Sequence, residues 1–148
     1  MSRLWRIWFV VWCCSIGVFG LVLAGGAIAV TSGPVRSIFS ILHGGTVTLD
    51  PPLQFSLAVV GAVSIGWAVT LHLTIRAAIE LGPQGRAFWH AINAGMVSWY
   101  AIDSILPVAT GFWLNVIPNT VLVGMYLVGL SGSGALRART SDVTTDRS

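Results

Sequence analysis

Four long apolar segments, separated by short polar connections, constrain this chain more than any other feature of its sequence. They cover residues 8–30, 55–79, 88–106 and 113–130. Each approaches or exceeds the roughly 20 helical residues that cross a bilayer's hydrocarbon core. With 55% hydrophobic and only 9% charged residues, the composition is that of a polytopic membrane protein. We therefore predict an all-α fold, with residues 1–130 forming one compact antiparallel bundle of four transmembrane helices.

The arginines predict how this bundle is oriented. Seven of the eight basic residues lie before the first segment, around the connection between the second and third, or after the fourth: Arg3, Arg6, Arg76, Arg86, Arg137, Arg139 and Arg147. Only Arg36 lies in the connection between the first two segments. By the positive-inside rule, both termini are cytoplasmic. The arginines are scattered singly rather than clustered in a patch, so we expect no nucleic-acid partner.

Two extramembrane regions have distinct patterns. Between the first two segments, Val35, Ile38, Phe39 and Leu42 recur at helical spacing. They predict a short amphipathic helix on the outer membrane surface, which Gly44 would end. Residues 131–148 are rich in Gly and Ser and then polar, which indicates a disordered cytoplasmic tail.

The first two segments carry small residues at helical spacing. The first has Cys13, Gly17, Gly20, Ala24 and Ala27, and the second has Ala58, Gly61, Ile65, Ala68 and His72. Small residues let membrane helices approach closely, so both rows are predicted to be packing faces. The first segment also resembles a signal peptide, but its apolar run exceeds the roughly 7 to 15 residues of such a signal, which favours an uncleaved anchor.

The third and fourth segments carry polar stripes instead. Asn93, Tyr100, Asp103 and Ser104 share one helical face, and Asn115 and Asn119 share another, while Trp99 lies deeper in its segment and could line a ligand site. The connection between the segments is short, so the helices must be antiparallel neighbours, and Asp103 should lie level with the two asparagines. An ionisable residue inside a span is a functional-site hypothesis by default.

Two prolines are expected to add to this polar cluster. Each lacks an N–H and displaces the carbonyl four residues earlier, so Pro107 would free that of Asp103 and Pro118 that of Leu114. If both stretches are helical, both helices kink there. Freed carbonyls at membrane depth are tolerated in a protected or wet cavity, which predicts a polar pocket in the outer leaflet.

The pocket predicts binding of a lipophilic small molecule from the bilayer. Asp103 is the candidate catalytic residue, as a single acid or base of the isomerase, cyclase or hydratase type, or else a polar anchor. The candidate ligand-binding residues are Asn115, Asn119, Tyr100, Trp99, Asn93 and Ser104. The alternative is an accessory or assembly subunit bound to another membrane protein, in which Asp103 only holds the helical hairpin together. A transporter component acting as a homo-oligomer is the second alternative.

We predict no cofactor and no metal. His72 and His90 are the residues that could ligate a bis-histidine haem, but their heights agree only loosely, which favours polar histidines near an interface. Metalloprotease, cytochrome c, nucleotide-binding and serine-hydrolase motifs do not occur in the sequence.

The chain resembles small four-helix bacterial membrane proteins. The resemblance consists of an apolar helix, an amphipathic segment and a Gly-rich helix, followed by the pattern Trp99, Asp103, Ser104, Gly111, Asn115 and Asn119. Such proteins are grouped as DoxX-like proteins or as domains of unknown function, and the resemblance covers residues 19–130. It implies a four-helix protein of the bacterial inner membrane and carries no catalytic assignment.

Overall fold

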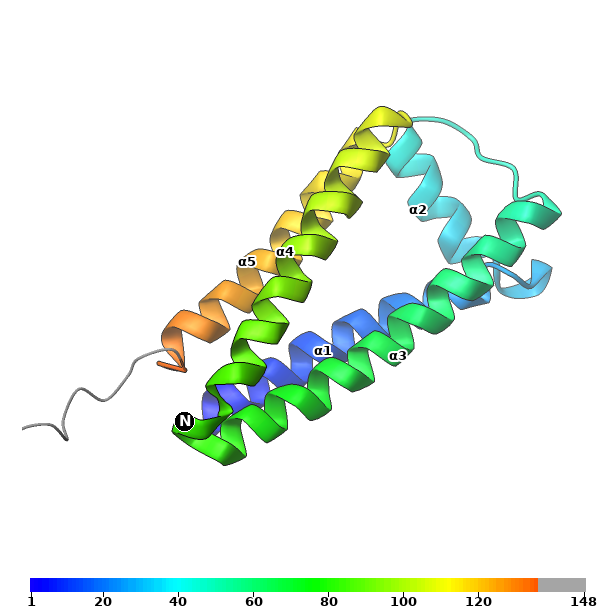
Figure 1. Ribbon diagram of the computed structural model, residues 1–148. Helices are drawn as coiled ribbons and strands as arrows, with labels where there is room; N and C mark the ends of the chain where they lie inside the picture. Colours follow the sequence, from blue (N-terminus) through cyan, green and yellow to red (C-terminus); the bar gives the residue numbers. More distant parts are fainter. Residues whose placement is uncertain (136–148) are drawn as a thin grey trace, which may run out of the picture.

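The computed structural model describes residues 1–135, whose regular secondary structure is all helical, with no strand (Figure 1). The α-helices are α1 (Arg3–Gly25), α2 (Gly33–His43), α3 (Pro51–Leu81), α4 (Arg86–Ala109) and α5 (Val116–Gly132). Single 3-10 turns lie in three of the four connections: η1 (Ala29–Thr31), η2 (Gly82–Gly85) and η3 (Trp113–Asn115). Residues 44–50, between α2 and α3, form no helix. The predicted all-α fold is confirmed.

The long helices are apolar enough to cross a membrane. Three continuous helical stretches of the described chain meet this condition: Arg3–Gly25, Pro51–Ala109 and Trp113–Gly132. The middle stretch contains both α3 and α4, and Figure 1 shows the chain reversing direction between them. The fold therefore has four long helices, of which α3 and α4 are joined by the tight turn η2.

The four long helices form two pairs, α1 with α3 and α4 with α5 (Figure 1). The pairs meet where α1 begins and where α3 turns into α4, and they diverge toward the opposite end. There α2 crosses from one pair to the other. The predicted compact bundle is therefore closely packed at one end and open at the other.

Two helix ends lie at positions that differ from the apolar pattern. Helix α1 begins at Arg3 and ends at Gly25, although the apolar run continues to residue 30. The side chain of Thr31 folds back and donates a hydrogen bond to the Gly25 carbonyl, with an Oγ1–O distance of 2.6 Å. Helix α3 starts earlier than predicted because the Asp50 carboxylate accepts a bond from the Leu53 amide at 3.0 Å, as an N-cap does.

Small residues allow α1 and α3 to pack backbone to backbone, as the sequence predicted. A Cβ added to Gly61 would lie 2.6 Å from the carbonyl oxygen of Gly20 and 2.8 Å from the Cα of Ala24. A Cβ added to Gly20 would lie 2.9 Å from the Gly61 carbonyl oxygen. No side chain fits in either space, so the close approach of the two helices requires glycine on both sides.

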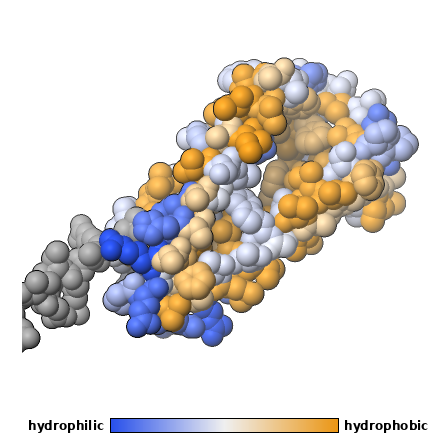
Figure 2. Space-filling model, viewed as in Figure 1, coloured by the Kyte–Doolittle hydropathy of each residue, from blue (hydrophilic) through white to orange (hydrophobic). Residues whose placement is uncertain are grey.

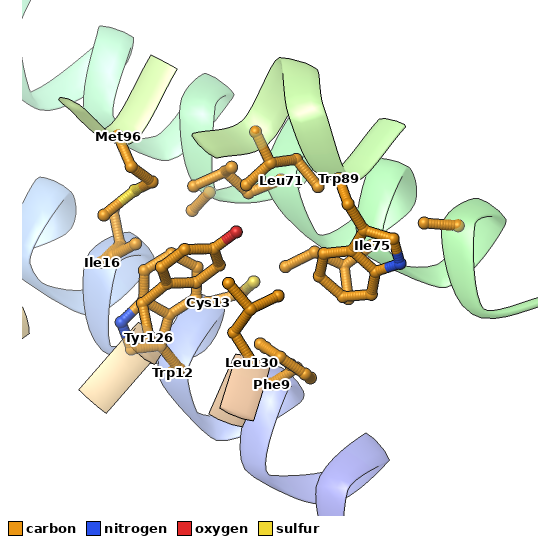
Figure 3. Packing of buried hydrophobic residues seen from close by; sticks show 13 residues of the cluster. Phe9, Trp12, Cys13, Ile16, Leu71, Ile75, Trp89, Met96, Tyr126 and Leu130 are labelled. Carbon is orange, nitrogen blue, oxygen red and sulfur yellow. The ribbon is translucent and has the colours of Figure 1, made fainter. Parts of the chain in front are cut away.

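The main core lies where all four long helices meet (Figure 3). Its buried aromatic centre is formed by Phe9 and Trp12 of α1, Trp89 of α4 and Tyr126 of α5. The rings of Trp12 and Tyr126 are 5.2 Å apart between centroids, and those of Phe9 and Trp89 are 5.6 Å apart. Aromatic contacts thus join the two helix pairs at this end of the fold.

A second, smaller core lies under α2, where Val35 is fully buried against Leu23 and Leu57. Farther along α2, the ring of Phe39 meets that of Phe112 with centroids 6.1 Å apart. The predicted amphipathic helix is present and ends at Gly44 in the left-handed conformation. Its apolar face packs against the rest of the protein, whereas the sequence predicted packing against a membrane surface.

The last helix differs from the predicted continuous span over residues 113–130. It starts at Val116 after the 3-10 turn η3, so Pro118 occupies its first turn. The backbone N–H at that position has no partner within a helix, so a proline there causes no kink and the predicted kink at Pro118 is wrong. Helix α5 continues to Gly132, into the segment predicted to be disordered, and the tail beyond residue 135 lies outside the described residues.

Candidate functional site

Two asparagines beside α4 bind its backbone. Asn115 ends η3 and Asn119 lies in the first part of α5. Both side-chain amides donate to the backbone carbonyl of Asp103, with Nδ2–O distances of 3.1 Å and 2.8 Å. Pro107, inside α4, cannot supply the N–H that normally occupies this carbonyl. The predicted free carbonyl is therefore present, and the two asparagines satisfy it.

The Asp103 carboxylate is left with little hydrogen bonding. Its one hydrogen-bond contact in the described chain is with Nδ2 of Asn115, at an Oδ2–N distance of 3.5 Å, near the upper limit for such a bond. The same amide already donates to the Asp103 carbonyl at a shorter distance. The residue is only partly buried, so the carboxylate can still accept hydrogen bonds from another group.

The direction of Asp103 follows from its neighbours on α4. At about 100° per residue, its position on the helix circumference falls between those of Trp99 and Tyr100. Trp99 faces α3, since its ring lies 5.4 Å from that of Trp67 between centroids. Tyr100 faces α5, since its hydroxyl lies 3.0 Å from Oγ1 of Thr120. Asp103 therefore lies on the side of α4 that looks between the two helix pairs.

The space beside Asp103 is hollowed. Figure 2 shows an opening between the α1 and α3 pair and the α4 and α5 pair, below α2, with hydrophobic residues on its visible walls. Trp99, one turn before Asp103 on α4, contacts Trp67 of α3, and the two pairs diverge toward α2. Asp103, on the side of α4 that looks between the pairs, is therefore oriented toward this opening.

The remaining polar residues mainly connect α4 to α5. The hydroxyl of Tyr126 donates to Oδ1 of Asn93 at 2.6 Å. The hydroxyl of Thr120 donates to the carbonyl of Val116 at 2.7 Å, so the proton in its contact with Tyr100 comes from the tyrosine. Asn93 and Tyr100 therefore serve helix pairing, and Thr120 is a partner that the polar pattern did not predict.

Ser104 differs from its polar neighbours. Its Oγ atom is buried and has no hydrogen-bond partner among the described residues. A helical serine often bonds the carbonyl one turn earlier, which here belongs to Tyr100, but no such bond forms. Among the seven predicted site residues, Ser104 is the one whose side chain has a fully buried polar atom without a hydrogen-bond partner in residues 1–135.

Trp8 and Trp12 have a role that their place near a helix end did not predict. Tryptophan there is typical of a membrane-interface belt. Instead, their indole N–H groups donate to the carbonyls of Met125 and Leu122 on α5, with N–O distances of 2.9 Å and 3.0 Å. Their spacing of four residues could have indicated this shared role, because it places both side chains on the same face of α1.

The two histidines considered as haem ligands differ in their surroundings. His72 lines a groove between α1 and α3, together with Cys13 and Arg76. His90 lies exposed near the start of α4 and does not line that groove. Within residues 1–135, no three His, Cys, Asp or Glu side chains come together to hold a metal ion.

The paired amides on the Asp103 carbonyl give a quantitative prediction. Replacing Asn119 with alanine should destabilise the protein by about 1 kcal/mol, within the range measured for hydrogen bonds between membrane helices. Pro107→Ala restores an N–H that can occupy the same carbonyl, so the cost of Asn119→Ala should shrink in that background. Reversible unfolding of the two single variants and the double variant measures this coupling, with Ser98→Ala on the exposed face of α4 as the control. Additive effects would contradict the shared acceptor.

Comparisons with known proteins give no relative: no family model, no curated protein and no solved structure matches the chain. The resemblance to DoxX-like proteins therefore stays a prediction from the sequence.

Proposed function

We propose that the chain is an integral protein of a bacterial inner membrane, with α1, α3, α4 and α5 each crossing the bilayer and both termini in the cytoplasm. The distribution of arginines supports this orientation. Arg3 and Arg6 in α1 and Arg76 and Arg86 around η2 lie toward the end where the helix pairs meet, whereas Arg36 is on α2. The excess of positive charge at one end is typical of a cytoplasmic side.

The length of α3 is compatible with this placement. Its 31 residues extend about 46 Å at 1.5 Å per residue, beyond the ~30 Å of a hydrocarbon core. A helix of that length tilts or projects past the apolar layer. The divergence of the two pairs tilts at least one of them relative to the membrane normal, so the hollow below α2 would open within the outer leaflet.

Within this protein, the proposed function is binding of a lipophilic small molecule in the hollow. The observation that supports it most strongly is the state of Asp103: both neighbouring amides are engaged by its backbone carbonyl, and its carboxyl group has only a 3.5 Å contact. A carboxyl group with unused hydrogen-bonding capacity beside an apolar space favours a polar group on the ligand.

The chemistry available to Asp103 is that of a single acid or base. As a carboxylate it accepts a hydrogen bond or a proton from the ligand, and as a carboxylic acid it donates one. The other acidic side chains in residues 1–135 have roles elsewhere: Asp50 caps the start of α3, and Glu80 near its end pairs with Arg76. These properties favour a reaction that moves protons, such as an isomerisation, cyclisation or hydration, over one that needs two carboxylates.

An accessory or assembly role is the second candidate. The hydrogen bonds from Asn115, Asn119 and Tyr126 to α4 favour it, because they use most of the polar stripe to hold the helices together. In that role Asp103 would contribute its carbonyl to the hairpin, and its carboxyl group would be dispensable. The two candidates therefore differ in what they require of one side chain.

Replacement of Asp103 distinguishes the two candidates. Native mass spectrometry of protein extracted from its own membrane should show a small-molecule adduct that Asp103→Ala and Asp103→Asn reduce at least about tenfold, since a hydrogen bond to a charged group contributes about 1.5–3 kcal/mol. Stability should change by less than about 1 kcal/mol, because the asparagine amides bind the backbone carbonyl at shorter distances than the 3.5 Å contact with the carboxylate.

Asp50→Asn is the matched control, because it removes a carboxylate while asparagine remains a good N-cap for α3. It should leave the adduct unchanged. Full adduct occupancy in Asp103→Asn would refute the role of the carboxylate. A stoichiometric protein partner without an adduct, unaffected by Asp103→Asn, would favour the accessory role.

A further inference from the structure

A second site lies at the opposite end of the fold, in a groove between α1 and α3. The groove encloses about 310 Å³, within the lower range of small-molecule sites. We call the end lined by Arg6, Arg76 and Glu80 the mouth of the groove. Val10, Cys13 and His72 line it farther along the two helices. It shares no residue with the polar cluster around Asp103.

The register of α1 against α3 brings the charged residues together. A Cβ added to Gly17 would lie 3.6 Å from Cβ of Ala68, so these residues face each other across the antiparallel pair. Counting equal numbers of residues back along α1 and forward along α3 places Arg6 level with Ile79. Arg76 is one helical turn from Ile79 on the same face. The two guanidinium groups therefore approach the same space from opposite helices.

The mouth of the groove has a surplus of positive charge. Nε of Arg76 pairs with Oε1 of Glu80 at 2.8 Å, and both side chains are more than half exposed. The outer guanidinium nitrogens of Arg76 take no part in this pair. Arg6 has no ion-pair partner among residues 1–135. One carboxylate thus faces two guanidinium groups, which leaves room for one more anion.

We propose that this groove binds the phosphate of a phosphate ester, supplied in the membrane by the headgroup of an anionic lipid. Arginine presents a planar set of N–H donors that matches phosphate oxygens, and basic pockets between helices on the cytoplasmic side bind anionic headgroups. The groove is at the arginine-rich end, so it would face the inner leaflet.

His72 extends this match toward the lipid. It lies four residues, about 6 Å along the helix axis, farther from the mouth than Arg76. When the phosphate of a glycerophospholipid lies at the mouth, its ester groups lie farther into the membrane, at the level of His72. A His72 N–H can then donate to an ester carbonyl. The exposed side chains of Val10, Val69 and Leu73 provide apolar surface beside the groove for the acyl chains. This gradient from charged to polar to apolar matches the end of a lipid molecule.

The inference rests on the proposed membrane placement but not on ligand binding at Asp103. If no small-molecule adduct depends on Asp103, the inference about the groove still stands. Its test therefore uses different residues and different probes.

The test compares three probes on the full-length protein purified in detergent: phosphatidylglycerol, phosphatidylcholine and inorganic phosphate. Native mass spectrometry should show one phosphatidylglycerol retained in preference to phosphatidylcholine. Arg6→Gln should reduce this retention about fivefold, the effect of one arginine near an anionic lipid surface. Arg3→Gln removes the same charge one helical turn away, outside the groove, and should have little effect.

Two further measurements identify the source of the phosphate. His72→Leu should weaken retention of the acylated lipid and leave any stabilisation by inorganic phosphate unchanged. If inorganic phosphate raises the unfolding temperature as much as phosphatidylglycerol does, and Arg6→Gln removes the effect, the phosphate site is supported and belongs to soluble phosphate esters. Equal lipid retention by Arg6→Gln and Arg3→Gln would overturn the site, as would no preference for either phosphate probe over phosphatidylcholine.

Discussion

A Trp12→Ala variant is expected to lose about 3–5 kcal/mol of stability, the usual cost of removing a large buried aromatic side chain. Trp12 has none of its surface exposed and stacks on Tyr126 in the main core. It also donates its indole N–H to the Leu122 carbonyl. Its loss would therefore weaken the contact between α1 and α5 in two ways.

Two control variants separate these contributions. Trp12→Phe keeps most of the aromatic packing and removes the N–H donor, so it should cost about 1 kcal/mol. Trp113→Ala removes a tryptophan that is 59% exposed and should have a much smaller effect on unfolding. Denaturant titrations followed by circular dichroism measure all three without depending on tryptophan fluorescence. Equal destabilisation by Trp12→Ala and Trp113→Ala would contradict the buried position of Trp12.

Gly61→Leu is expected to separate α1 from α3. Even a single Cβ at this position would meet the backbone of Gly20 and Ala24, which cannot move aside as a flexible side chain can. Overpacking typically costs about 1–3 kcal/mol, and a leucine in a backbone contact should exceed that range. The unfolding free energy and protease resistance of the purified protein would both fall.

Gly66 provides a matched control on the same helix. A Cβ added there would have no atom within 4 Å, apart from the two neighbouring residues and the backbone of its own helix. Gly66→Leu should therefore be tolerated, and Gly66→Ala should be neutral or slightly stabilising because alanine is the better helix former. If Gly61→Leu were as stable as Gly66→Leu, the two helices could not be packed as closely as described.

The sequence predicted those parts of the fold that depend on spacing along one helix. The small residues around Gly20 and Gly61 predicted the two packing faces through which α1 meets α3, and the apolar face of residues 35–42 predicted α2. Such patterns are local, because positions three or four apart on a helix share a face whatever the tertiary structure is.

Features that depend on tertiary contacts were not predictable in the same way. The apolar face of α2 could pack equally well on lipid or on protein, and only the position of Phe112 and the core around Val35 decides between them. Likewise, the polar stripes placed Asn115 and Asn119 near Asp103 correctly. They did not show that the amides bind the backbone carbonyl and leave the carboxyl group with only a long contact.

The hydrogen bonds from α1 to α5 have a consequence for biosynthesis. Trp8 and its acceptor Met125 are 117 residues apart in the chain, and Trp12 and Leu122 are 110 apart. At ~5–20 residues per second, α5 is synthesised on the order of ten seconds after α1. During that interval α1 can already pack against α3 through their glycines, but its two indole N–H groups have no acceptor. Helix α1, which is made first, is therefore fully paired only after α5 has been made.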